Sequence, residues 1–163
     1  MTITEDPIRI PVRLDFDAIV PEYSRAVTAL DDAATAELDR AGIDSRLREI
    51  IRLRASQLNG CAYCVDLHSN AARAAGETEQ RLHAVAIWRE SSFFTAQERA
   101  ALALAESMTR LSETHVPDAV FDDARAVFSD DELAAIVVAI VTINTWNTIG
   151  VTTRCWRPRR SRS

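Results

Sequence analysis

Two cysteines and a histidine lie close together in the sequence, as Cys61-Ala-Tyr-Cys64 and His68. If a helix begins near Cys61, spacings of three and four residues place all three side chains on one face of its first two turns. The positive end of the helix dipole and the unpaired N–H groups there favour a thiolate over a thiol. Two cysteines separated by two residues in a helical turn also lie within disulfide reach. This segment predicts a pair that cycles between dithiol and disulfide.

Glu49 lies 12 residues before Cys61, on a helix that we expect to fold back antiparallel at Asn59-Gly60. A carboxylate beside His68 or a cysteine would accept or relay a proton, and its burial would raise its pKa toward that role. In the structural alternative, Glu49 pairs with a nearby arginine on a solvated helix face. The spacing leaves both interpretations open.

A zinc site is the main chemical alternative for these residues. Cys61, Cys64 and His68 would supply three ligands, whereas a structural zinc site has four. None of the remaining cysteine and histidine residues is close enough in sequence to complete the set, so we expect no metal. The remaining residues of these types are His83, His115 and Cys155.

The composition predicts one helical domain. A chain of 163 residues is long enough to bury a core of its own, and 26 Ala against 4 Gly and 5 Pro favour helices over sheets. All 19 basic residues are Arg, so Schiff-base chemistry and a P-loop lysine are excluded.

Charge and hydropathy limit the partners and the location. Residues 1–153 carry 14 Arg against 24 acids, a net charge of −10, which argues against nucleic acid as the main partner. The segment 154–163 carries five Arg and no acid, and we interpret it as a frayed basic tail. The longest apolar run, Leu133 to Ile143, is shorter than a bilayer span, and the acidic start does not resemble a signal peptide. We therefore expect a cytoplasmic protein without membrane contact.

Periodicity and capping signals predict an all-α, single-domain bundle of six or seven helices. Thr95-Ala-Gln-Glu98 and Ser129-Asp-Asp-Glu132 are capping boxes that open two of them. Residues 1–16 are expected to form an extended arm that packs on a neighbouring surface. The other helices are expected at about 21–42, 44–59, 62–75, 78–89 and 117–128.

The late helix that starts at Ser129 is apolar almost all round, so another helix or another subunit must cover it. We expect at least a homodimer. Asn144 and Asn147 lie in this helix and need hydrogen-bond partners if they are buried, and we expect them to find those partners at a subunit interface.

The pattern from Glu49 to His68 is specific: Glu, eleven residues, Cys, two residues, Cys, three residues, His. It resembles the signature of the alkylhydroperoxidase D-like branch of the carboxymuconolactone decarboxylase superfamily. The surrounding sequence, including Leu53-Arg-Ala-Ser-Gln-Leu-Asn-Gly before Cys61, is similar to this branch across residues 44–112.

The resemblance implies an all-helical oligomer, from dimer to hexamer, and a peroxidase or thiol–disulfide oxidoreductase with an antioxidant role and no cofactor. Cys64 would meet the peroxide, Cys61 would resolve the sulfenic acid, and Glu49 with His68 would move protons. A dithiol donor, such as a lipoyl protein, would return the electrons.

Two departures from the family pattern bear on activity. Tyr63 lies between the cysteines where members with peroxidase activity can carry His, which predicts weak peroxide turnover, and the Arg-rich tail has no family counterpart. The decarboxylase branch lacks the cysteine pair, so that reaction is disfavoured. The alternative function is a non-catalytic oligomeric helical module, or a passive redox sensor.

Overall fold

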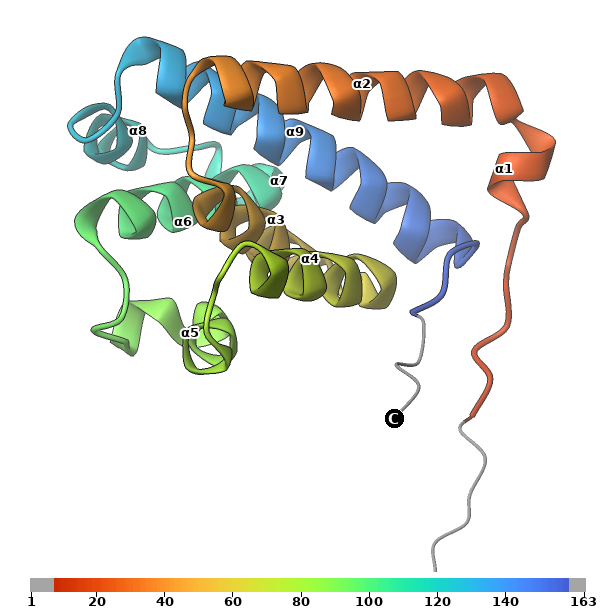
Figure 1. Cartoon of the computed structure of the whole chain (residues 1–163). Helices are drawn as coiled ribbons and strands as arrows, with labels where there is room; N and C mark the ends of the chain where they lie inside the picture. The colour runs from red at the N-terminus through yellow and green to blue at the C-terminus, as the bar shows by residue number, and fades with distance from the viewer. Residues whose placement is uncertain (1–7, 159–163) are drawn as a thin grey trace, which may run out of the picture.

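The structure is a computed structural model, and it describes residues 8–158. Within that range the chain forms nine α-helices and one 3-10 helix, with no strand, so the predicted all-α class is confirmed (Figure 1). Short helices raise the count above the six or seven predicted. The elements are α1 (Phe16–Ile19), α2 (Pro21–Arg40), α3 (Ser45–Asn59), α4 (Ala62–Ala74), α5 (Glu79–Ala84), η1 (Val85–Glu90), α6 (Ala96–Thr109), α7 (Leu111–Thr114), α8 (Asp118–Arg125) and α9 (Asp130–Thr153).

Local capping explains where the main helices begin and end. The side chain of Asp44 accepts a hydrogen bond from the backbone of Arg46 at the start of α3, and both predicted capping boxes form at α6 and α9. At the end of α3, Gly60 has φ of 70°, a left-handed conformation that glycine adopts without steric cost. This turn lets α4 fold back along α3.

The expected helix over 78–89 is interrupted. It starts as α5 and continues as the 3-10 helix η1, in which Ile87 leaves helical geometry with φ of −123°. The tighter winding leaves Trp88 buried while Ile87 is exposed. Tertiary contact of the indole therefore overrides the local helical pattern.

Helix α9 forms the centre of the bundle, where it packs against α2, α3 and α6. Its Ile136 and Ile140 are fully buried in the main hydrophobic core. By length and composition α9 would be able to cross a membrane. The contacts with α2, α3 and α6 leave 44% of its most apolar stretch buried, and Val141 and Val151 stay exposed.

A polar network on α9 links it to α3. Asn59 donates to the side-chain oxygens of Asn144 and Asn147 at 2.8 and 2.9 Å, and Asn147 donates to Ser56 at 3.0 Å. The expectation that these α9 asparagines find their partners at a subunit interface was wrong, because α3 supplies them within the chain. The network satisfies polar groups that burial would otherwise destabilise.

A buried carboxylate ties α3 to η1 and α6. Glu106 accepts hydrogen bonds from Arg54 at 2.6 Å, from the Trp88 indole at 2.9 Å and from Arg89 at 2.7 Å. Burial by itself raises the pKa of Glu106, but these bonds and the two guanidinium charges outweigh it and hold the pKa below its usual value. The carboxylate is therefore ionised at neutral pH.

The two ends of the described chain meet beside α9. The backbone N–H groups of Arg13 and Leu14 both donate to the carbonyl of Thr153, at 2.8 and 3.1 Å. Residues 8–15 form no regular element and are exposed, and Arg13 and Leu14 make the backbone contact with the end of α9. The first seven residues of the predicted arm and residues 159–163 of the predicted tail lie outside the described residues.

Candidate active site

The turn between α3 and α4 places the two cysteines together. They form a disulfide with a Cα–Cα distance of 5.3 Å. Helix α4 begins at Ala62 with Cys61 as its N-cap, and the sulfur of Cys61 accepts the backbone N–H of Cys64 at 3.3 Å. Cys64 lies in the first turn of α4, where the helix dipole and free N–H groups favour negative charge on sulfur.

Glu49 of α3 lies against His68 of α4, with 2.8 Å between Oε2 and Nδ1. Its other oxygen accepts from Nη1 of Arg52 at 3.0 Å, so the carboxylate contacts both the histidine and an arginine. Glu49 is only 9% exposed. Glu49 therefore contacts the histidine, as the proton-relay interpretation expects, and an arginine, as the alternative expects. It is buried, however, and does not lie on a solvated helix face.

The electrostatics of Glu49 differ from the sequence expectation. Burial does raise the pKa of this carboxyl group, but the hydrogen bond and charge of His68, together with those of Arg52, outweigh burial and leave the pKa below its usual value. An ionised carboxylate only accepts hydrogen bonds, so Nδ1 of His68 carries the proton. The other ring nitrogen, Nε2, is then free of that bond.

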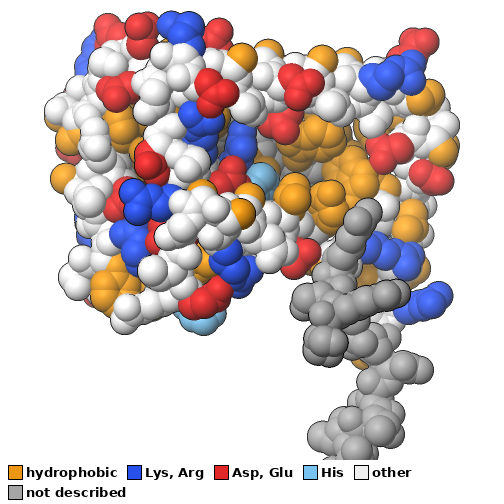
Figure 2. Space-filling model, viewed as in Figure 1, with side chains coloured by type: hydrophobic (Ala, Val, Ile, Leu, Met, Phe, Trp, Pro, Cys, Tyr) orange, Lys and Arg blue, Asp and Glu red, His pale blue; other side chains and the backbone are white. Residues whose placement is uncertain are grey.

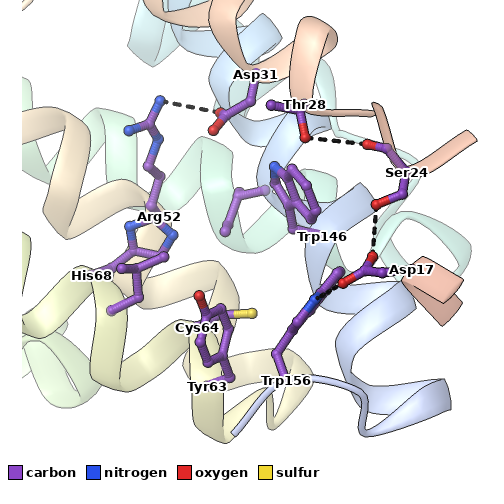
Figure 3. Close-up of a pocket in the computed structure, with 12 residues that line it drawn as sticks. Asp17, Ser24, Thr28, Asp31, Arg52, Tyr63, Cys64, His68, Trp146 and Trp156 are labelled. Carbon is purple, nitrogen blue, oxygen red and sulfur yellow. Dashed lines mark hydrogen bonds and ion pairs between the residues drawn. The ribbon is translucent and has the colours of Figure 1, made fainter. Parts of the chain in front are cut away.

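Cys64 and His68 line the same cavity, which has a volume of about 280 Å³ (Figure 3). Figure 2 shows hydrophobic side chains gathered in the hollow between α2 and α4. Arg52 and Asp31 lie on one side of the cavity and Asp17, Ser24 and Thr28 on another, and five aromatic and aliphatic side chains supply the apolar part of the lining. The full lining is Asp17, Ser24, Thr28, Asp31, Arg52, Tyr63, Cys64, Leu67, His68, Ile143, Trp146 and Trp156.

Arg52 has one nitrogen to spare at this cavity. Its Nη1 is bonded to Glu49, whereas its buried Nη2 has no hydrogen-bond partner among the described residues and lies 3.8 Å from Asp31. The sequence pattern marked Arg52 only as a neighbour of Glu49. No local signal distinguishes it from the other arginines of α3.

Trp156 closes one side of the cavity, and sequence reasoning missed it. Its indole lies 5.9 Å from the ring of Tyr63 and 5.2 Å from that of Trp146, and its N–H donates to Asp17 of α1 at 2.8 Å. These residues come from both ends of the chain and from α4 and α9. Only the tertiary fold brings them together.

The other cysteine and histidine residues do not line the cavity at Cys64. His83 is exposed on α5, and His115 ends α7 in a left-handed conformation. Cys155 is partly buried and accepts a hydrogen bond from Thr153. Between residues 8 and 158, no group of three or more His, Cys, Asp or Glu side chains is arranged to hold a metal ion.

Fold and site together define an all-helical protein with a disulfide at the start of one helix and a carboxylate–histidine pair beside it. The chain belongs to the carboxymuconolactone decarboxylase family, whose family model matches residues 21–107, and within it to the alkylhydroperoxidase D-like branch.

Three known proteins are similar to this chain. A crystal structure from Agrobacterium tumefaciens, of unknown function and described as a candidate antioxidant defence protein AhpD, is 41% identical with a TM-score of 0.85, covering 92% of this chain and 100% of that one. The uncharacterised protein YdfG of Bacillus subtilis is 34% identical over 139 residues, 85% of this chain and 92% of YdfG.

The third protein, a debrominase, shares the fold at 24% identity and a TM-score of 0.70, over 81% of this chain and 69% of its own. The family and its AhpD-like members indicate a role related to peroxidases and antioxidant defence. The debrominase shows that the fold alone does not set the reaction.

Proposed function

We propose that this protein is a thiol-dependent peroxidase or thiol–disulfide oxidoreductase that works through Cys64 and Cys61. One observation carries the proposal: Cys64 opens onto a cavity that also contains His68, and Glu49 holds that histidine by a 2.8 Å bond. A sulfur nucleophile, a proton carrier and its orienting carboxylate are therefore brought together by α3 and α4.

In the oxidative step, Nε2 of His68 takes the proton of the Cys64 thiol, and the thiolate attacks the outer oxygen of a hydroperoxide. The O–O bond breaks, the sulfenic acid of Cys64 forms, and the alkoxide leaves with the proton from His68 as an alcohol. The Cys61 thiol then displaces hydroxide, which leaves as water, and the disulfide forms. The balance is two thiols and one hydroperoxide converted to one disulfide, one alcohol and one water.

Glu49 keeps His68 in the required state. Because its pKa is held low, it stays an acceptor, fixes the proton on Nδ1 and stabilises the imidazolium that forms during transfer. The spare Nη2 of Arg52 can donate to the polar end of a substrate in the cavity. Tyr63 at the same wall offers no imidazole, in keeping with slow peroxide turnover.

A dithiol donor, for which lipoyl compounds are the model, reduces the disulfide and completes the cycle. The cytoplasm is the matching location, since a reducing compartment sustains such a donor. We also propose that the protein is a homo-oligomer. A shallow groove with exposed apolar side chains between α6, α7 and α9 would be covered by a second copy, and its residues include Met108, Leu111, Val116 and Val141.

The test is a steady-state assay of the pure protein with hydroperoxides and a lipoyl donor, run beside Cys64→Ser. We expect turnover that this variant loses. Thiol titration before and after one equivalent of peroxide distinguishes a catalytic cysteine pair from a passive redox sensor. A cycling pair loses two thiols and recovers them repeatedly with the donor, whereas oxidation without turnover would contradict the proposal.

A further inference from the structure

A second hollow, of about 390 Å³, reaches the other cysteine. It is lined by Cys61 but not by Cys64, whereas the cavity described above is lined by Cys64 but not by Cys61. Tyr63 and Trp156 line both hollows, and their rings lie 5.9 Å apart. These two aromatic side chains therefore form a wall between separate approaches to the two ends of one disulfide.

The absence of a side chain at Gly150 leaves room beside the Cys61 sulfur. Gly150 of α9 lines the second hollow, and a Cβ at this position would lie 3.1 Å from Sγ of Cys61 and 3.4 Å from the ring of Trp156. Any larger residue would crowd the sulfur. The hollow therefore leads toward the sulfur as well as to the backbone of the α3–α4 turn.

The second hollow is basic. Its lining includes Arg13, Arg154 and Arg157 and no acidic residue, whereas the cavity at Cys64 includes Asp17 and Asp31. The Nη1 of Arg13 donates to the backbone carbonyl of Thr152 at 3.5 Å, and the arm and the C-terminal segment that carry these arginines are joined by the bonds to Thr153. Three guanidinium groups around an opening whose lining has no acidic residue favour an anionic ligand.

We propose that the hollow at Cys61 is the entrance for the reductant, and that it selects a small thiol bearing a carboxylate. The inference rests on the proposed function, because it assigns the reducing half of that cycle. Peroxide enters at Cys64 and the thiol enters at Cys61, so the two substrates do not compete for one cavity. The volume of about 390 Å³ suits a molecule of the size of dihydrolipoate.

The reducing step balances as two exchanges. The thiolate of the donor attacks Sγ of Cys61, the disulfide breaks, and Cys64 leaves as a thiolate that His68 can protonate. The second thiol of the donor then attacks its own mixed-disulfide sulfur and releases the Cys61 thiolate. The donor becomes a cyclic disulfide, two electrons pass to the protein, and both cysteines return to the reduced form.

Dihydrolipoate and dihydrolipoamide test the proposed preference for a carboxylate directly. They carry the same dithiol, but the first has a carboxylate where the second has an amide. The oxidised protein is mixed with each dithiol without peroxide, and disulfide loss is followed by quenched thiol labelling. At low salt we expect dihydrolipoate to react about 5-fold faster, a modest case of electrostatic steering. The preference should shrink as ionic strength rises.

The variant Arg154→Gln/Arg157→Gln should lower the ratio of the dihydrolipoate rate to the dihydrolipoamide rate, because two of the three arginines that line the hollow lose their charge. The matched control is Arg25→Gln/Arg40→Gln, which removes two exposed arginines from α2 that line neither hollow and should keep the preference. Equal rates for the two dithiols in the wild type would overturn the inference and leave the proposed cycle standing. Failure of both dithiols to reduce the protein would overturn the cycle itself.

Single-cysteine proteins locate the anion preference at one sulfur. Cys64→Ser/Cys155→Ala leaves Cys61, and Cys61→Ser/Cys155→Ala leaves Cys64. Each is titrated with the dianionic Ellman disulfide and with neutral dithiodipyridine. The ratio of the two rates should be about 5-fold higher for Cys61, because only its hollow is basic. A higher ratio at Cys64 would place the anionic entrance on the wrong side and contradict the inference.

Discussion

The carboxylate of Glu49 and the imidazole of His68 meet at 2.8 Å, although 19 positions separate them in the chain. Asn59 and Gly60 end α3, and α4 returns along it, so the two side chains face each other across the helix pair. Arg52 completes the contact from the next turn of α3. This pairing couples a charge on one helix to the proton position on the other.

Replacing Glu49 with Gln removes the charge while keeping the shape of the side chain. We expect turnover with hydroperoxide to fall by about 10²–10⁴-fold, the usual loss for an impaired general acid–base system. The circular dichroism spectrum should match the wild type. Glu79→Gln, an exposed glutamate paired with Arg73, is the control and should retain full activity. Wild-type turnover of Glu49→Gln would show that the pairing has no part in proton transfer.

The order of the two cysteines is testable with a sulfenic acid trap. Cys64→Ser should form no sulfenic acid, whereas Cys61→Ser should let Cys64 oxidise and accumulate as sulfenic acid or higher oxides, because no resolving thiol remains. Mass spectrometry of the trapped adduct gives the answer, with Cys155→Ala in both backgrounds. An adduct on Cys61 in place of Cys64 would reverse the assignment.

Acid should destabilise the fold through Glu49 and Glu106. The pKa of each is lower in the folded chain than usual, so below about pH 4.3, the ordinary glutamate value, the unfolded chain binds more protons than the folded one. Their stabilising contribution is fully present above that pH and is lost as pH falls through the folded-state pKa values. The Tm of the wild type should therefore drop below about pH 4.3, and less steeply in Glu106→Gln. Equal slopes for both proteins would refute this origin.

Glu106→Gln should lower stability without touching the redox site. It leaves the guanidinium groups of Arg54 and Arg89 without their shared counter-charge, at a cost of about 3 kcal/mol or roughly 10 °C in Tm. Thermal melts at pH 7 measure the loss, and the Tm of Glu37→Gln, which removes only an exposed pair with Arg40, should stay near that of the wild type. Activity at 20 °C should be kept, and a loss of activity at full stability would point to a direct catalytic part.

The proposed assembly depends on the apolar groove beside α9. Val141 is 49% and Leu111 57% exposed, so a second copy would remove both from water. Light scattering at micromolar concentration should report at least a dimer. Val141→Glu should shift the mass toward the monomer, whereas Arg110→Glu, which adds negative charge at an exposed position that does not line the groove, should leave the mass unchanged. A monomeric wild type would contradict the proposal.

Several features were determined by the sequence alone because they depend on neighbours within a few residues. The two capping boxes, the turn at Gly60 and the apolar stripes fixed the main helices, and the spacing of Cys61 and Cys64 was enough to predict a disulfide. Glu49 was a candidate because a single turn separates two helices, although its spacing left a solvated ion pair as the alternative. The same capping motif or cysteine spacing predicts the same local structure in any sequence, because it depends only on nearby residues.

The tertiary structure decided what distant segments do. Burial of Trp88 broke the helix expected over 78–89, and α3 supplied the partners of the α9 asparagines. The charges of His68 and Arg52 set the pKa of Glu49 against the effect of burial, which no spacing reveals. Trp156 separates the two hollows because both ends of the chain meet over the disulfide. Contacts between residues more than a hundred positions apart depend on the packing of the whole bundle, and the local sequence does not predict them.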